Sequence, residues 1–188
     1  MKPLYLFVGK SSSGKTTISE ILEAQHGLKT LQSYTTRPKR YENETGHTFI
    51  TDAEFDKLQN IVAYTEYDNH RYCATKEQID DTDIYVIDIP GVETLLDAYD
   101  TERPIVIMYF DADVVTRIHR MINRGDSDNK IVGRLIQDEA DNWSKQLADI
   151  YMVNHHRVSL RTINAGKDKD EVLEKVLFNI KHLEDKNN

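Results

Sequence analysis

A glycine-rich stretch near the start of the chain has the residue types and the spacing that bind the phosphates of a nucleotide. Residues 9–16 read Gly-Lys-Ser-Ser-Ser-Gly-Lys-Thr, which matches the pattern G-x-x-x-x-G-K-[ST] at every fixed position. Glycines let the backbone wrap closely around a phosphate, and exposed N–H groups at a helix amino terminus favour anions. An apolar run at 4–8 and an amphipathic pattern at 16–26 flank the stretch, as the motif requires. The motif therefore predicts a nucleoside triphosphate site.

We expect this phosphate loop to supply most contacts to ATP, with Mg²⁺ as the accompanying metal. Lys15 would reach the β and γ phosphates, and the Thr16 hydroxyl would bind the Mg²⁺ ion. The predicted ATP-binding residues here are Gly9, Lys10, Ser11, Ser12, Ser13, Gly14, Lys15, Thr16 and Thr17. A plain glycine-serine turn is the alternative interpretation, and the flanking strand and helix disfavour it.

A second cluster of cations follows at 33–40, where the chain reads Ser-Tyr-Thr-Thr-Arg-Pro-Lys-Arg. Arginine suits a phosphate because its planar guanidinium offers two parallel donors. Pro38 favours an extended backbone at Arg37, which would hold that side chain open. Composition alone is equally compatible with a solvated charged loop, so both interpretations stand at this point.

The order of these and later motifs resembles the guanylate kinase family of nucleoside monophosphate kinases. Besides the two stretches above, the resemblance rests on Gly46, Tyr-Cys-Ala-Thr-Lys-Glu at 72–77, a strand ending at Asp88, a lid-like segment at 120–135, and Val153-Asn154. These pieces span most of the chain in the family's order. The resemblance implies an α/β fold: a P-loop NTPase-type three-layer αβα parallel sheet with a small, partly β nucleoside-monophosphate lobe and a lid.

The resemblance also implies roles for individual residues. The side chains implied to hold the acceptor's phosphate are Ser33, Arg37, Arg40 and Tyr72. The catalytic side chains implied around the transferred phosphoryl group are Lys15, Arg120, Arg124 and Arg134. Asn154 resembles a residue beside the donor adenine, and Asp88 resembles a carboxylate near the metal. Two plainer interpretations stay open, namely Asp88 as a helix cap and the lid arginines as solvated helix residues.

The positions at which the family reads guanine differ in this chain. Counted back from Tyr72, the family's carboxylate falls at Ala63, and its hydroxyl two residues after Tyr72 falls at Ala74. A site that hydrogen-bonds a base discriminates strongly, so two alanines weaken the assignment of guanine specifically. If the hairpin register differs, Thr65, Glu66 or Asp68 would supply the polar groups that contact the base instead. The family's second phosphate-binding tyrosine has no clear counterpart, and the nearest residues are His47 and Phe49.

Apolar runs that alternate with helical patterns predict the elements that position these residues. Strands are predicted at 4–8, 28–33, 84–89, 105–110 and 151–153, and the main helices at 16–26, 92–99, 113–123, 131–147 and 170–183. Residues 34–48 read as a long irregular loop. Capping boxes starting at Thr51 and Thr75 predict short helices, and Asp68-Asn69 predicts a hairpin turn.

This alternation predicts a parallel sheet with helices on both faces and ligands at the carboxyl ends of its strands. We expect one guanylate-kinase-like domain over residues 1–188, with a core at 1–33 and 81–188. The lobe for the monophosphate would be 34–80, and the lid about 124–134 within the core.

Charge and cysteine content exclude several classes of protein. The 188 residues include 24 Lys and Arg against 32 Asp and Glu, a formal net charge of −8, which disfavours nucleic acid and anionic membranes as partners. The single cysteine cannot form an internal disulfide, which indicates an intracellular protein. With no signal peptide or membrane span in the pattern, we expect a cytoplasmic protein, a monomer or homodimer that binds small-molecule nucleotides.

The function predicted first is ATP- and Mg²⁺-dependent phosphoryl transfer to a nucleoside monophosphate, with GMP or dGMP favoured. A kinase of another phosphorylated small molecule, such as a modified nucleotide or a ribose phosphate, is the near alternative. A non-catalytic guanylate-kinase-like interaction module is the third. The intact Gly-Lys-Thr at 14–16 disfavours that module, because such modules tend to lose phosphate-loop residues.

Overall fold

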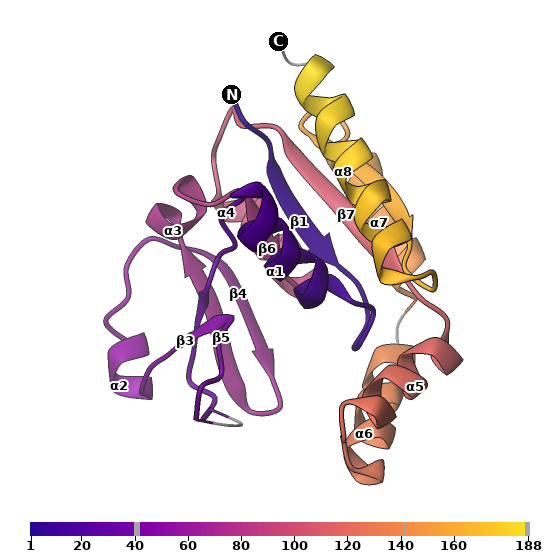
Figure 1. Ribbon diagram of the computed structural model, residues 1–188. Helices are drawn as coiled ribbons and strands as arrows, with labels where there is room; N and C mark the ends of the chain where they lie inside the picture. Colours follow the sequence, from indigo (N-terminus) through magenta and orange to yellow (C-terminus); the bar gives the residue numbers. More distant parts are fainter. Residues whose placement is uncertain (40–41, 141, 187–188) are drawn as a thin grey trace.

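A four-stranded parallel sheet forms the centre of the computed structural model, which describes residues 1–39, 42–140 and 142–186 (Figure 1). Its strands are β1 (Leu4–Val8), β6 (Ile84–Val86), β7 (Ile105–Asp111) and β8 (Val158–Asn164). They lie in the order β6-β1-β7-β8, and every neighbouring pair is parallel. The carboxyl ends of all four strands therefore meet at one edge, which is where a ligand is expected.

Helices cover both faces of this sheet, because successive strand residues point to opposite sides. Tyr5 and Phe7 pack in one buried cluster with α1 (Lys15–His26) and α8 (Lys169–Lys186). Leu4, Leu6 and Val8 face the other cluster, which contains residues of α4 (Ile89–Ala98) and α7 (Trp143–Asn154). The predicted three-layer αβα arrangement is confirmed, and it fixes β1, and hence the loop after it, between two packed layers (Figure 1).

A second, smaller sheet contains the segment that carries the predicted acceptor ligands. Its strands, in the order β3-β2-β5-β4, are β3 (His47–Phe49), β2 (Ser33–Thr35), β5 (His70–Thr75) and β4 (Ile61–Tyr67). The capping boxes at Thr51 and Thr75 start α2 (Asp52–Phe55) and α3 (Lys76–Asp80), as predicted. The hairpin turn is also confirmed, with φ of 52° at Asp68 and 59° at Asn69.

The prediction of a strand at 28–33 followed by a long loop was wrong. Only an isolated parallel bridge forms at Thr30, opposite Ile84, and the regular strand begins at Ser33. Within the predicted loop, β2 and β3 pair in parallel, and β2 also pairs antiparallel with β5. These pairings join segments distant in sequence, so local patterning could not reveal them.

The prediction of a strand at 151–153 was also wrong, because these residues are helical and end α7. The predicted helix at 131–147 is two helices, α6 (Asp128–Glu139) and α7. The last strand of the sheet is β8 instead, which was not predicted and whose buried residues, Val158 and Ile163, do not alternate regularly. Helix α5 (Val114–Asn123) and α6 pack on each other beyond the strand ends.

The second sheet and the α5–α6 pair lie on opposite sides of the loop that follows β1 (Figure 1). The division into core, lobe and lid stays a prediction about how these parts move. Across the described ranges, no helix is both long and apolar enough to span a membrane.

Candidate nucleotide-binding and phosphoryl-transfer site

The loop at 9–14 connects β1 to α1 and has a strained, closely packed backbone. Gly14, the N-cap of α1, has a φ of 99°, in a region that glycine adopts far more easily than other residues. Ser12 also has a positive φ of 59°, which is uncommon for a residue with a side chain. Gly9 packs so closely that a Cβ atom would lie 2.6 Å from the carbonyl oxygen of Phe110. Such strain is typical of functional loops.

Lys15 reaches back over this loop and is held by its backbone. Its Nζ donates to the carbonyl oxygens of Gly9 at 2.5 Å and Lys10 at 3.0 Å, and to the Ser13 hydroxyl at 3.3 Å. Desolvation lowers the pKa of Lys15 to about 8, although the neighbouring Asp138 carboxylate opposes this shift. An anion beside Lys15 would therefore stabilise its charged form.

The hydroxyl of Ser12 is buried and finds no hydrogen-bond partner among the residues that the structure describes. Buried polar groups are nearly always hydrogen-bonded, so an unpartnered hydroxyl in a phosphate-type loop is a group that a ligand can satisfy.

Two cavities meet at the phosphate loop. The first, about 400 Å³, lies over the start of α1, and we call it the donor cavity. Its residues are Ser12, Ser13, Gly14, Lys15, Thr16, Thr17, Ile18, Arg120, Arg124, Ala165, Lys169 and Val172. The second, about 410 Å³, extends from the loop toward the smaller sheet, and we call it the acceptor cavity. Both have the size of small-molecule sites, and they share Ser12, Lys15 and Arg124.

Two of the predicted acceptor ligands, Ser33 and Tyr72, line the acceptor cavity. His47 lines it with them, and its Nδ1 lies 2.9 Å from the Ser33 hydroxyl. The rings of His47 and Tyr72 are in edge contact, with centroids 5.6 Å apart. These three side chains form one polar corner of the cavity, which we call the Ser33 corner.

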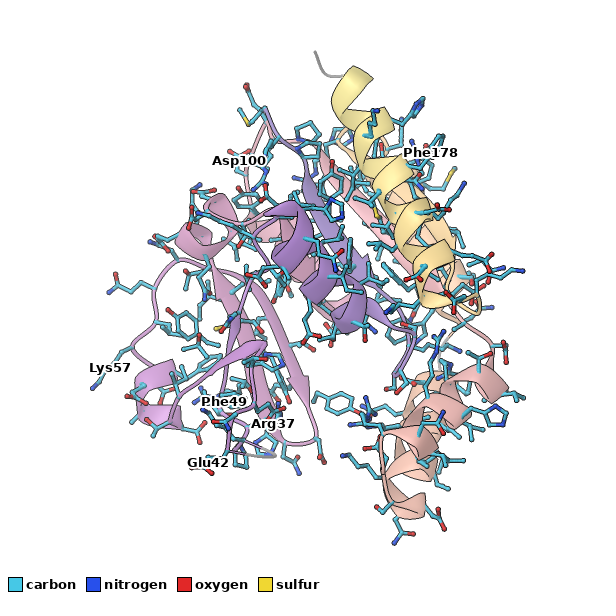
Figure 2. All side chains as sticks on the ribbon, viewed as in Figure 1. Arg37, Glu42, Phe49, Lys57, Asp100 and Phe178 are labelled. Atoms are coloured by element: carbon cyan, nitrogen blue, oxygen red, sulfur yellow. The ribbon has the colours of Figure 1, made fainter. Side chains whose placement is uncertain are left out.

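Arg37 lies behind the Ser33 corner rather than in the cavity wall. Its two terminal nitrogens donate to the carboxylate of Glu44 at 3.1 and 2.9 Å, and its guanidinium lies 5.2 Å from the centre of the Phe49 ring (Figure 2). Burial alone would lower the pKa of Arg37, but Glu44 and the nearby Tyr72 hydroxyl raise it above its ordinary value. The fourth predicted acceptor ligand, Arg40, lies outside the described residues.

Asp88 caps a helix and also lies in the wall of the acceptor cavity. Its side chain caps α4 by accepting from the Gly91 N–H at 2.9 Å, and it accepts from the Thr65 hydroxyl at 3.0 Å. It also lines the acceptor cavity with Lys15. Burial raises the pKa of Asp88 above its usual value, against the opposing effect of these hydrogen bonds and of the Lys15 charge. A cation beside this carboxylate would offset its desolvation.

The three predicted lid and core arginines lie around the two cavities but make different contacts. Arg120 donates to the carbonyl oxygens of Ser13 at 3.2 Å and Ala165 at 2.8 Å, which ties the phosphate loop to the end of β8. Arg124 and Arg134, by contrast, both donate to Asp126.

Asp126 forms ion pairs with three cations of this region. Its carboxylate accepts from Arg124, from Arg134 at 3.1 Å and from Lys130 at 3.0 Å. Partial burial alone would raise the pKa of Asp126, but these cations lower it to about 2. We call this group the Asp126 cluster.

The structure does not bring Asn154 to the donor cavity. Asn154 ends α7 and hydrogen-bonds the carbonyl of Ile150 and the side chain of Arg157. Arg157 precedes β8, so Asn154 lies at the amino-terminal edge of the sheet, opposite the phosphate loop. Four residues of the donor cavity were not predicted from the sequence: Ile18 of α1, and Ala165, Lys169 and Val172, which follow β8. Predicting the strand β8 would have pointed to the last three.

The two alanines at the guanine-reading positions are buried and face each other across β4 and β5. Ala63 pairs with Ala74 in the register of the hairpin, and both pack in the core. Thr65 and Glu66 line the acceptor cavity, whereas Asp68 sits in the hairpin turn and is not among its lining residues. The polar side chains that β4 presents to this cavity are therefore those of Thr65 and Glu66, two and three residues after Ala63.

The fold is that of a P-loop α/β protein with the architecture of a nucleotide kinase. Its defining features are a parallel sheet between two layers of helices, a strand–phosphate loop–helix unit, and two cavities that meet at that loop. No protein-family model matches the chain. It is 26% identical over 168 residues to a guanylate kinase of Nitrosomonas europaea, covering 82% of this chain and 83% of that protein.

The fold is also similar to that of a solved guanylate kinase. The crystal structure of guanylate kinase from Anaplasma phagocytophilum superposes with a TM-score of 0.53 at 13% identity, over 97% of this chain and 86% of the other. The chain is therefore similar to guanylate kinases in sequence, at 26% identity, and in fold. These relatives support a nucleotide-kinase-like function.

Proposed function

We propose that this protein transfers the γ-phosphoryl group of ATP, with Mg²⁺, to a nucleoside monophosphate, with GMP or dGMP as the leading acceptor. One observation carries the proposal. The donor and acceptor cavities meet at Ser12, Lys15 and Arg124, so two ligands can lie end to end with their phosphates at the same lysine. That is the arrangement a direct transfer between two phosphorylated molecules needs.

In the donor cavity, the loop backbone and the first turn of α1 would hold the phosphates of ATP. In the acceptor cavity, the Ser33 corner would bind the phosphate of the acceptor, with the charge of Arg37 behind Tyr72. An oxygen of that phosphate forms a bond to the γ-phosphorus while the bond from the γ-phosphorus to the β–γ bridging oxygen breaks, and ADP leaves with the electron pair. Lys15, Arg124 and Arg134 would stabilise the negative charge of the transition state.

A magnesium ion fits the residues at this junction. Mg²⁺ is commonly held by one or two protein oxygens together with substrate phosphates and water. The Thr16 hydroxyl, in the wall of the donor cavity, and the Asp88 carboxylate, in the wall of the acceptor cavity, would supply these protein oxygens. Asp88 is desolvated, so a cation beside it would stabilise its charged form. When bound, the ion would neutralise charge on the β and γ phosphates.

A second acceptor class has a specific observation in its favour. Ala63 and Ala74 are buried in the core and offer no polar group to a guanine edge. Thr65, Glu66 and Tyr67 line the cavity instead, and such hydroxyl and carboxylate groups suit the hydroxyls of a sugar as well as the N–H groups of a base. A modified nucleotide or a ribose phosphate is therefore the second candidate.

The proposal is tested by measuring ADP release from ATP and Mg²⁺ with a panel of acceptors. The panel contains GMP, dGMP, AMP, CMP, UMP and ribose phosphates. We expect GMP or dGMP to raise the rate at least tenfold above the rate without acceptor, because the terminal phosphoryl group then has an acceptor beside it. Stimulation by a sugar phosphate alone would support the second candidate. Binding of no nucleotide at all would contradict both and favour an interaction module.

Arg37→Ala tests the position of the acceptor phosphate. We expect the KM for the acceptor to rise about tenfold, because the variant loses the positive charge behind the Ser33 corner and leaves the buried Glu44 carboxylate without this partner, while the KM for ATP stays within about twofold. The control is Lys57→Ala, which removes an exposed cation that extends into solvent from the same lobe (Figure 2). Thermal unfolding of both variants shows whether loss of the Glu44 pair also destabilises the lobe. A change in the KM for ATP alone would mean that the two sites are interchanged.

A further inference from the structure

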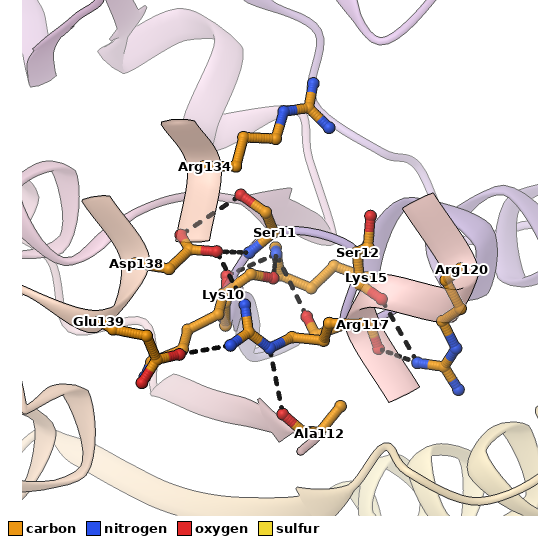
Figure 3. Close-up of polar contacts among 12 residues, drawn as sticks. Lys10, Ser11, Ser12, Lys15, Ala112, Arg117, Arg120, Arg134, Asp138 and Glu139 are labelled. Atoms are coloured by element: carbon orange, nitrogen blue, oxygen red, sulfur yellow. Dashed lines mark hydrogen bonds and ion pairs between the residues drawn. The ribbon is translucent and has the colours of Figure 1, made fainter. Parts of the chain in front are cut away.

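Asp138 contacts the phosphate loop, although it belongs to helix α6. Its Oδ2 accepts from the backbone N–H of Ser11 at 2.9 Å, and its Oδ1 from the Ser11 hydroxyl at 3.3 Å (Figure 3). The residue is only 7% exposed. A backbone N–H of a phosphate loop is a donor suited to a phosphate oxygen, and here a carboxylate of the protein takes it.

A buried arginine holds this carboxylate in place. Arg117 of α5 is 1% exposed, and it donates to Asp138 at 2.9 Å and also to Glu139. Glu139 accepts in turn from Lys10 at 2.8 Å. Figure 3 shows Arg117 between the two carboxylates, with Lys10 and Ser11 of the loop beside them. The end of α6 is thus tied to two consecutive residues of the phosphate loop.

Ser11 lies on the side of the loop that faces the acceptor. It lines the acceptor cavity and is absent from the described lining of the donor cavity, whereas Ser12 and Lys15 line both. In the proposed function, the terminal phosphate is the part of the donor nucleotide that lies nearest the acceptor, so it is the group that would approach Ser11. The Ser11 N–H would then lie where a triphosphate has a phosphate and a diphosphate has none.

We propose that Asp138 is a specificity-determining residue that discriminates between a triphosphate and a diphosphate in the donor cavity, because it occupies the Ser11 N–H that a γ-phosphate would take. This inference rests on the proposed function. Two anions cannot share one N–H in a desolvated site without strong repulsion, so a γ-phosphate displaces the Asp138 carboxylate. A diphosphate leaves the contact between Asp138 and Ser11 intact. After transfer, Asp138 returns to the loop while ADP is still bound.

The test compares the binding of a non-hydrolysable ATP analogue and of ADP, each with Mg²⁺, to wild type and to Asp138→Asn by titration calorimetry. Asparagine keeps the shape of the side chain and removes the charge. We expect the analogue to bind about tenfold more tightly to the variant, and ADP to change by less than about twofold. The control is Asp149→Asn, which removes an exposed carboxylate from α7 and should change neither affinity. Equal changes for both nucleotides, or weaker binding of the analogue, would overturn the proposal.

Arg117 keeps its pair with Glu139 in this variant, and circular dichroism shows whether the variant folds.

Trp143 provides a second measurement in the wild-type protein, since it is the single tryptophan of the chain and begins the helix after α6. We expect the ATP analogue, and not ADP, to change its fluorescence; equal responses would also overturn the proposal. A wild-type protein that binds neither nucleotide contradicts the proposed function itself, whereas binding of both with no effect of Asp138→Asn contradicts only the role of Asp138.

Discussion

Replacing Lys15 by alanine is expected to lower kcat by about a hundredfold to a thousandfold, the usual effect of removing one group that stabilises transition-state charge. Lys15 is among the few side chains that line both cavities, and its Nζ is already held over the loop by two carbonyl oxygens. Its contribution is therefore a positioned charge at the junction. The measurement is steady-state turnover with the best acceptor of the panel.

Lys15→Ala should leave the fold intact, because burial lowers the pKa of Lys15 to about 8 and so disfavours the charged lysine in the free protein. Lys29→Ala is the matched control, since Lys29 is paired with Asp81 on an exposed surface and is expected to leave turnover unchanged. An unchanged kcat in Lys15→Ala would remove this lysine from the mechanism, and an unfolded variant would show that its role is structural.

Replacing Gly9 by alanine is expected to weaken ATP binding about a hundredfold and to destabilise the protein by roughly 1–3 kcal/mol, as overpacking in a tight site does. A Cβ at this position would lie 2.6 Å from the Phe110 carbonyl oxygen and 2.8 Å from the Ser13 hydroxyl. The carbonyl belongs to β7, a central strand that is hydrogen-bonded on both sides, so it cannot easily move. The loop must shift instead, which would displace the backbone N–H groups that would hold the phosphates of ATP.

Gly133→Ala is the control for the added methyl group. Gly133 lies inside α6, and a Cβ there meets no atom of the described residues within 4 Å. Alanine is the better helix former, so this variant should be slightly more stable, by about 0.5–1 kcal/mol. Calorimetric binding of ATP and thermal unfolding are the measurements for Gly9→Ala. ATP affinity equal to that of wild type would show that the close packing of Gly9 has no part in shaping the loop.

The parts of the fold that local sequence specifies were predictable. The phosphate-loop motif, the capping boxes at Thr51 and Thr75 and the turn at Asp68 each depend on a few consecutive residues, and each forms as expected. The short parallel pair β2–β3 depends on contacts with distant strands, which no local pattern reveals. The last strand was missed for a different reason, because the apolar residues at 151–153 resemble a strand although they end a helix.

In the candidate site, too, the features set by local sequence were predictable and those set by tertiary contacts were not. The sequence motif indicated the residues of the phosphate loop, and all of the predicted ATP-binding residues at 9–17 except Lys10 line at least one of the two cavities. Lys10 pairs with Glu139 instead. The pairing of Arg37 with Glu44 and the placement of Asn154 at the far edge of the sheet depend on tertiary structure. Asp138 gave no signal in the sequence, because its contact with Ser11 joins segments more than a hundred residues apart.

The Asp126 cluster affects how much the charges of this region would rearrange when a phosphate binds. With a pKa of about 2, Asp126 stays ionised at any ordinary pH, so Arg124, Lys130 and Arg134 remain assembled in the empty protein. The repulsion among three like charges is overcome once, when the chain folds. In the proposed reaction, an arriving phosphate would only exchange places with the Asp126 carboxylate, and the electrostatic rearrangement in each catalytic cycle would be correspondingly small.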